Sequence, residues 1–233
     1  MLIDSVSDTF KKISHAAMRA GRSPEEIRLI AVTKTVEVEV LREAVDIGLR
    51  VFGENKVQEA REKIGQLKGL LGEHALNIEW HLIGHLQKNK AKYAVQLFDL
   101  IHSVDSIELA EELNRQAERT GKLQRILVQV KLSAETTKHG AAEQELLPLL
   151  ERTAALRNLD VRGLMTMPPF FDDPERARPY FRRLRELRDA AEQKGFRLPE
   201  LSMGMSDDFE VAIGEGATMV RIGTRIFGKR PVH

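Results

Sequence analysis

Hydrophobic and polar positions follow two different periods along this chain. In residues 2–20 the apolar side chains recur at helical spacing, which predicts an amphipathic first helix. From Arg28 onward, short apolar runs alternate with segments of helical periodicity. The runs that predict strands span residues 28–35, 50–55, 78–84, 100–104, 125–132, 160–165, 200–204 and 217–222.

This alternation predicts the fold. Eight strands, each followed by a helical segment, are typical of an α/β protein with a (β/α)₈ TIM barrel. An open, doubly wound sheet is the main rival, but no glycine-rich nucleotide-binding fingerprint follows the first strand. No linker, repeat or low-complexity segment interrupts residues 1–233, so we expect a single barrel domain with an N-terminal helix.

Composition and charge narrow the function classes. The chain carries 36 basic and 35 acidic residues, a balance that disfavours a dedicated nucleic-acid binder. The run 182–188 mixes both signs and predicts a solvated helix face rather than a nucleic-acid patch. Cysteine is absent, which excludes disulfides and a cysteine nucleophile. Without a signal peptide or an apolar run of about 18 residues, we expect a cytoplasmic protein without membrane contact. No apolar surface stands out, and we expect a monomer.

The first strand ends in a lysine. Ile30, Val32 and Lys34 share one face of the predicted strand 28–35, so this face would carry an ammonium group to the mouth of an apolar interior. Burial lowers the pKa of a lysine, and the neutral amine is the form that makes Schiff bases. The alternative is a lysine at a strand end whose ammonium group reaches water.

Other polar side chains follow the remaining strands, where barrel enzymes place their active residues. Candidates at these positions are Asn55, His81, Ser103, Ser206 and Arg221. The histidine at position 81 has a second histidine four positions later, but the pattern around it is that of a strand, so a metal pair is disfavoured.

The last two strands predict an anion site. Arg221 lies on the same face as Met219 inside an apolar run, and Gly223 and Thr224 follow directly. Loops after the seventh and eighth strands of such barrels commonly bind phosphate. Ser206 is expected to open a helix whose free N–H groups face the same region, so a phosphate anchor from Ser206, Gly223 and Thr224 is our hypothesis.

A lysine after the first strand, a phosphate loop after the eighth and a neighbouring arginine form a set suited to pyridoxal 5′-phosphate (PLP). With these motifs the sequence closely resembles the pyridoxal phosphate homeostasis protein family. The resemblance spans nearly the whole chain and rests on residues 31–34, 53–55, 57–59, 80–84, 86–89, 163–165, 201–207, 220–224 and 226–228. Lys56 is a departure, because the family usually has tyrosine after the Gly-Glu-Asn triplet.

The resemblance implies specific roles. Lys34 corresponds to the lysine that forms a covalent Schiff base with PLP, and Ser206, Gly223 and Thr224 to the groups that hold its phosphate. Arg221 corresponds to the partner of the pyridine nitrogen, and Asn55 to a polar neighbour of the ring. The fold is expected to be similar to the barrel domain of alanine racemases, without their second domain.

Two functions are consistent with this resemblance. The first is a PLP carrier without catalytic residues or a metal, which buffers the cofactor or delivers it to PLP-dependent apoenzymes. An arginine cannot accept a proton from the pyridine nitrogen, so the ring would stay a weak electron sink. The sequence ends at His233, and we expect no further domain that brings a second base. The alternative is an amino-acid racemase or a related PLP enzyme that uses Lys34 as one base.

Overall fold

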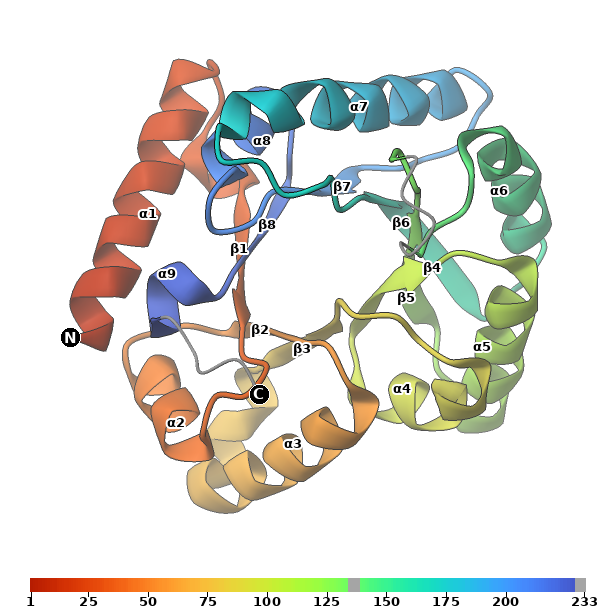
Figure 1. Cartoon of the computed structure of the whole chain (residues 1–233). Helices are drawn as coiled ribbons and strands as arrows, with labels where there is room; N and C mark the ends of the chain where they lie inside the picture. Colours follow the sequence, from red (N-terminus) through yellow and green to blue (C-terminus); the bar gives the residue numbers. More distant parts are fainter. Residues whose placement is uncertain (134–138, 229–233) are drawn as a thin grey trace.

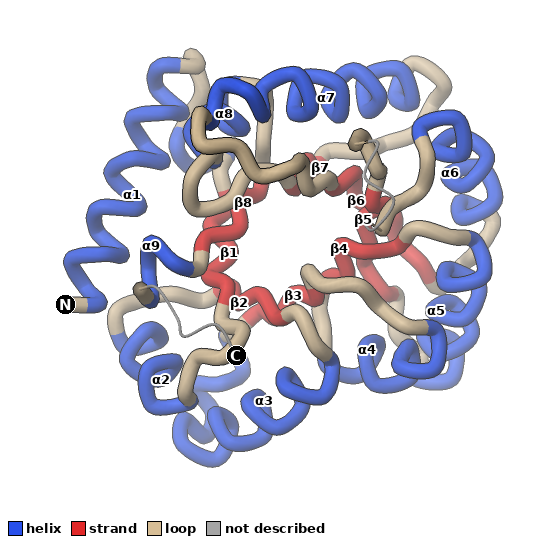
Figure 2. Tube along the Cα trace, in the orientation of Figure 1, coloured by secondary structure: helices blue, strands red, loops and turns tan. Residues whose placement is uncertain are grey.

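A computed structural model describes residues 1–133 and 139–228 of the chain. Within this part, eight parallel strands form a closed barrel, drawn as the inner ring in Figure 2. Their bounds are β1 (Arg28–Val32), β2 (Val51–Glu54), β3 (Glu79–Leu82), β4 (Leu100–Val104), β5 (Gln124–Gln129), β6 (Leu159–Met165), β7 (Glu200–Ser202) and β8 (Met219–Ile222). The last strand pairs with the first, which closes the barrel and confirms the predicted TIM-barrel fold.

Helices surround the strands (Figure 1). They are α1 (Leu2–Arg19), α2 (Val38–Asp46), α3 (Val57–Leu71), α4 (Ala91–Leu97), α5 (Ile107–Thr120), α6 (Leu146–Ala154), α7 (Arg178–Glu192), α8 (Phe209–Gly214) and α9 (Thr224–Phe227). Short 3₁₀ segments are η1 (Pro24–Glu26), η2 (Gly72–Asn77), η3 (Lys88–Lys90), η4 (Glu143–Glu145) and η5 (Pro174–Ala177). Helix α1 packs on the outside, against α8 and α9. None of the helices in the described segments combines the length and apolar character that a membrane crossing requires.

Alternation along the strands divides the protein into an outer core and a barrel interior. Outward-facing side chains pack beneath the helices, for example Phe52 and Trp80, whose ring centroids are 5.4 Å apart. Inward-facing apolar side chains form a separate small cluster of Ile30, Leu100, Leu127, Met165 and Met219. This cluster fills part of the barrel, and polar side chains occupy other inward positions.

Some predicted boundaries are wrong by a few residues, with consequences for the site. The strand predicted over 28–35 ends at Val32, because the chain turns at Lys34 and Thr35. The helix predicted to start at Ser206 begins at Phe209. Ser106 caps α5 by accepting a hydrogen bond from the Leu109 N–H. Residues 134–138, which follow the predicted fifth strand, and the chain end with His233 lie outside the described residues.

We predict that Gly163→Ala destabilises the barrel by more than about 3 kcal/mol. A Cβ atom at this position would lie 1.8 Å from the carbonyl oxygen of Glu200, so β6 and β7 would be forced apart. Gly65→Ala in α3 is the matched control, since a Cβ there would meet no neighbouring atom within 4 Å, and it should stabilise the protein by about 0.5–1 kcal/mol. Urea denaturation measures both. Unchanged stability in Gly163→Ala would contradict the close approach of these strands.

Candidate functional site

A cavity of about 430 Å³ lies at the carboxyl ends of the strands and brings all the predicted cofactor-binding residues together. Small-molecule sites of this size are common, and this end of a TIM barrel is their usual place. Apolar side chains and a few polar groups share its wall, as such sites require. The lining residues are Lys34, Asn55, Ser206, Arg221, Gly223 and Thr224, together with Val32, Ile83, Gly84, His85, Met167, Met205 and Asp207.

Lys34 borders this cavity and is exposed, in agreement with the alternative of a lysine that reaches water rather than with a buried amine. The residue lies in a turn after β1, because the strand ends before it. The next residue, Thr35, has a φ of 58°, a left-handed conformation that is unfavourable for a β-branched side chain. Such strain persists where surrounding contacts enforce it, and it often marks functional sites. Here the Thr35 N–H donates to the Glu59 carboxylate at 2.5 Å.

A buried lysine on α3 also anchors this turn by hydrogen bonds. The Lys63 ammonium donates to the Thr33 carbonyl at 2.6 Å, and to the carboxylates of Glu54 at 2.7 Å and Glu59 at 2.9 Å. Burial raises the pKa of the Glu54 carboxyl, and the nearby Lys63 opposes that shift. The segment that carries Lys34 is therefore tied to α3 by charge-assisted hydrogen bonds.

The predicted anion site has a different local structure from the one expected. Ser206 precedes α8 by a turn, so its hydroxyl is not the helix cap. Instead, the Ser206 hydroxyl oxygen accepts a hydrogen bond from the Gly223 N–H at 3.3 Å, which joins the loops after β7 and β8. Thr224 is exposed and begins α9. These residues form one edge of the cavity, beside the Lys34 turn, because β8 pairs with β1.

Arg221 forms part of the inner wall of the cavity, with only 3% of its surface exposed. Its guanidinium donates to the Ser202 hydroxyl at 2.6 Å and to the Thr166 carbonyl at 3.0 Å. Burial lowers the pKa of Arg221 to about 10, with a smaller opposing effect of Asp208, so the side chain stays charged at neutral pH. Asn55 is half-buried, and its carbonyl lies so close to Gly84 that a Cβ at that glycine would clash at 2.2 Å.

The barrel interior beneath the cavity holds a histidine pair. His81 and His102 are fully buried, and the His102 Nε2 lies 2.9 Å from the His81 Nδ1. The sequence predicts His81 at a strand end, but it lies inside the barrel instead. Ser103 is also predicted at a strand end, but its buried hydroxyl has no hydrogen-bond partner in the described residues. The alternation of β4 would have favoured His102 over Ser103, since Leu100 marks the inward positions.

His85 lies apart from His81, near the mouth of the cavity, so the two residues form no helical metal pair. It gathers with Asp105 and His139, and ligand atoms of these three lie within 4.8 Å of one another. The rings of His85 and His139 stack 3.6 Å apart and only 9° from parallel. In-plane lone pairs of parallel rings do not converge on one ion, so we describe this group as an aromatic stack and assign no metal to it.

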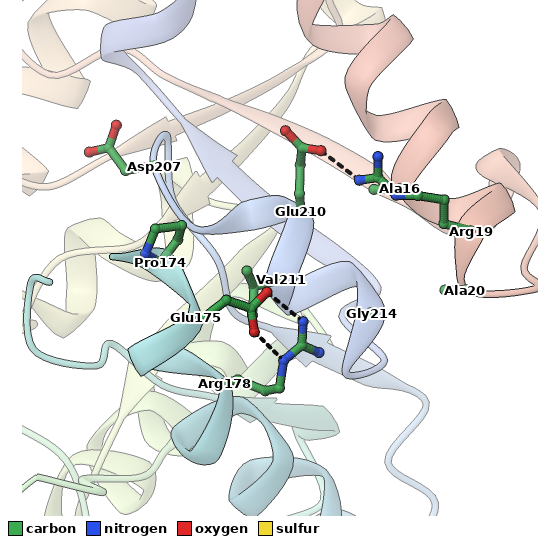
Figure 3. Close-up of a pocket in the computed structure, with 10 residues that line it drawn as sticks. All are labelled: Ala16, Arg19, Ala20, Pro174, Glu175, Arg178, Asp207, Glu210, Val211 and Gly214. Atoms are coloured by element: carbon green, nitrogen blue, oxygen red, sulfur yellow. Dashed lines mark hydrogen bonds and ion pairs between the residues drawn. The ribbon is translucent and has the colours of Figure 1, made fainter. Parts of the chain in front are cut away.

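A larger cavity of about 610 Å³ lies outside the barrel, between α1, α8 and the start of α7 (Figure 3). The charged groups that line it are largely paired with one another. Arg19 donates to Glu210 at 2.7 Å, and Arg178 forms a bidentate pair with Glu175 at 2.6 and 2.8 Å. None of the predicted cofactor-binding residues lines it. The cavity at the barrel mouth is therefore the stronger candidate for a functional site.

The arginine-rich stretch of α7 is also ion-paired. Glu215 is buried and accepts from Arg178 at 2.9 Å and Arg182 at 3.1 Å, with Arg185 at 3.3 Å. Arg183 pairs with Glu143 across the surface. These arginines connect α7 to its neighbours, in agreement with the mixed signs of the sequence.

Comparisons with known proteins agree on one family. Residues 11–231 match the family model for the alanine racemase N-terminal domain. The pyridoxal phosphate homeostasis protein of Aquifex aeolicus is 47% identical over 97% of each chain. PipY of Synechococcus elongatus, solved with PLP bound, is 37% identical, with a TM-score of 0.85 over 98% of this chain and 100% of PipY. An alanine racemase of Clostridium difficile shares the fold at 16% identity and a TM-score of 0.73, and this chain covers 58% of its length.

We predict that Lys63→Met lowers the free energy of unfolding by about 3–5 kcal/mol, because it leaves the buried Glu54 carboxylate without its cation. A second change, Glu54→Gln in the same protein, should recover a large part of that loss. The double-mutant cycle, measured by urea denaturation, gives the coupling of the pair. Additive losses would show that the two side chains do not interact.

We also predict that the protein loses stability as the pH decreases below about 6.5, the ordinary pKa of histidine. Burial lowers the pKa of His81 and His102 in the folded protein, so only the unfolded state takes up these protons as the pH drops. Each histidine then costs up to about 1.4 kcal/mol per pH unit. The low pKa of Glu79, about 2, acts only below pH ~4.5 and leaves this window unaffected.

Denaturation between pH 5 and 7 tests this prediction. The change of the free energy of unfolding with pH should be smaller in His102→Leu, because this variant lacks one of the histidines that only the unfolded state protonates. His15→Asn, on the exposed face of α1, is the control and should keep the slope of the parent. Equal slopes in all three proteins would contradict buried, neutral histidines.

Proposed function

This chain belongs to the pyridoxal phosphate homeostasis protein family, and we propose that it binds PLP reversibly through a Schiff base with Lys34 and buffers or delivers the cofactor. The observation that carries the proposal is the single cavity that collects Lys34, Arg221 and the edge formed by Ser206, Gly223 and Thr224. PipY, which shares the fold over its full length, binds the same cofactor.

The donor set of the cavity fits PLP group by group. Lys34 offers a primary amine for the aldehyde, and the condensation releases one water. Ser206 and Thr224 offer hydroxyl donors for the phosphate, while the Gly223 N–H lies within the same edge. Val32, Ile83 and the methionines at positions 167 and 205 supply apolar surface for a flat ring. Arg221 would lie at the pyridine nitrogen.

The charge on Arg221 favours holding the cofactor over using it. A guanidinium has donors but no acceptor, so its partner atom must carry a lone pair. A pyridine nitrogen beside Arg221 therefore stays unprotonated. When bound, PLP supplies an electron sink for carbanion chemistry, and that sink is strong only when the ring is protonated. Arg221 thus supports a carrier whose recipients are PLP-dependent apoenzymes.

The exposed position of Lys34 supports reversibility. Water or a free amine can reach the carbon joined to an exposed lysine, so hydrolysis or exchange can release the cofactor. A deeply buried Schiff base would need an opening of the protein before release. The strained turn at Thr35 and the buried Lys63 would keep the amine in place between rounds of binding and release.

We predict that PLP added to the protein gives a near-visible absorption band and that borohydride traps it on Lys34. Peptide mass mapping identifies the labelled lysine. Lys34→Ala should abolish the band and leave the unfolding midpoint in the absence of PLP within about 2 °C, since it removes exposed atoms. Lys56→Ala, at an exposed lysine nearby, is the matched control. Label spread evenly over surface lysines would refute the proposal.

The phosphate edge has its own test. Thr224→Ala should weaken PLP binding by about tenfold and pyridoxal binding much less, because pyridoxal lacks the phosphate. Spectroscopic titration with each compound measures the two affinities. An equal loss for both compounds would remove Thr224 from the phosphate site.

An amino-acid racemase remains the alternative function, because His85 and Asp207 also line the cavity and both can accept protons. The assay is alanine racemisation with PLP-loaded protein, compared with free PLP at the same concentration. A carrier should not exceed the rate of free PLP. A faster rate that is lost in both Lys34→Ala and His85→Asn would establish the enzyme instead.

A further inference from the structure

A chain of buried polar groups runs through the barrel from the cavity to the opposite end. It starts at Arg221, whose Nη1 lies 2.6 Å from the Ser202 Oγ, and the His102 Nδ1 lies 2.9 Å from the same oxygen. His102 Nε2 and His81 Nδ1 are 2.9 Å apart. The His81 Nε2 then lies 3.1 Å from the Glu79 carboxylate, at the first residue of β3.

The two ends of this chain fix the position of every hydrogen within it. Arg221 can only donate, and an ionised Glu79 can only accept. His81 must therefore donate from Nε2 to Glu79 and, as a neutral ring, accept at Nδ1. His102 then donates from Nε2 and accepts at Nδ1, which leaves the Ser202 O–H as the donor to that nitrogen. The Ser202 lone pairs remain for Arg221, so each contact contains one hydrogen.

Other arrangements leave a buried group without a partner. If His102 donated from Nδ1, the Ser202 oxygen would accept twice and its own hydrogen would have no acceptor within residues 1–133 and 139–228. An unsatisfied buried donor is costly. A protonated histidine pair would force this arrangement, because a cationic ring donates from both nitrogens.

The charged groups around the pair also keep it neutral. Arg28 on β1 and Arg125 on β5 face His81 and disfavour its protonation, whereas the Glu79 carboxylate favours it. Arg221 and Arg28 face His102 and disfavour its protonation. Burial is the largest effect on both rings and lowers their pKa values. Glu79 in turn accepts from His81 at 3.1 Å and from Arg125 at 2.9 Å, and these contacts keep the carboxylate ionised.

We propose that Glu79, His81, His102 and Ser202 are positioning residues that hold Arg221 as a charged, donor-only group in the cavity wall. Only the identity of the ligand is taken from the proposed function. The ligand atom that faces Arg221 must be a hydrogen-bond acceptor, as an unprotonated pyridine nitrogen is. None of these four residues lines the cavity itself. They act through Arg221, which makes two hydrogen bonds within the described part of the chain and can offer its other N–H groups to the ligand.

The first test uses the protein without PLP. Long-range ¹H–¹⁵N spectra of histidine-labelled protein distinguish the tautomers, with single histidine variants for assignment. Both His81 and His102 should carry hydrogen on Nε2 alone at pH 7. A charged ring at pH 7, or hydrogen on Nδ1 of either residue, would overturn the proposal.

The second test compares two buried serines. Ser202→Ala removes the acceptor of Arg221 and should raise the PLP dissociation constant by about tenfold. It should also change the absorption of the bound cofactor, because the ring nitrogen loses its fixed partner. Ser103→Ala removes a buried hydroxyl that has no partner in the described residues, and PLP affinity should stay within about twofold. Equal effects of the two changes would overturn the positioning role.

These tests separate failure of the inference from failure of the proposed function. Borohydride trapping on Lys34 reports PLP binding whatever the tautomers are. The tautomers are read without PLP and would stand even if no label reached Lys34. Trapping on Lys34 combined with hydrogen on Nδ1 of His102 would leave the function and remove the positioning chain.

Discussion

A buried positive charge in a barrel interior is the constraint on which the site depends. Moving an isolated cation out of water costs several kcal/mol, and Arg221 lies almost wholly inside the protein. No carboxylate contacts its guanidinium directly within the described residues. Its hydrogen-bond acceptors are the neutral oxygens of Ser202 and Thr166, and the ionised end of its hydrogen-bond chain is Glu79. The interior histidines connect this carboxylate to the arginine.

The turn that carries Lys34 solves a similar problem differently. Lys63 is a second buried cation, but carboxylates contact it directly and it also binds a backbone carbonyl. The result is a rigid support under an exposed lysine. Hydrogen bonds thus fix both Arg221 and the turn that carries Lys34, and the strained Thr35 backbone is held by its bond to Glu59. Preorganised donors of this kind bind a ligand without the cost of ordering them first.

The sequence predicts the architecture well and identifies residues that line one cavity, but it does not predict the contacts that support them. Apolar runs separated by helical segments are enough for the barrel, and the ends of its strands identify the cavity residues from Lys34 to Thr224. Lys63 could not be found in this way, because a lysine in an amphipathic helix resembles a surface residue until its buried partner Glu54 is known. The alternation of β4 could have indicated that His102 faces inward, but its contact with Ser202 joins β4 and β7, which lie far apart in sequence. Local patterns also place Lys34 on the strand, whereas it lies in an exposed turn with Thr35.

The contrast between the exposed lysine and the buried arginine bears on how a carrier would work. Binding energy for PLP would come from the fixed side of the cavity, where Arg221 and the Ser206 edge need not move. The covalent bond would form on the accessible side, where water and amines can also break it. A carrier needs both properties, since tight non-covalent contacts retain the cofactor and an accessible bond lets it leave. The reverse, a protonated ring and a shielded reaction centre, favours the stabilisation of a carbanion by an enzyme. In this protein the hydrogen bonds behind Arg221 disfavour a protonated ring, and the exposure of Lys34 disfavours a shielded reaction centre.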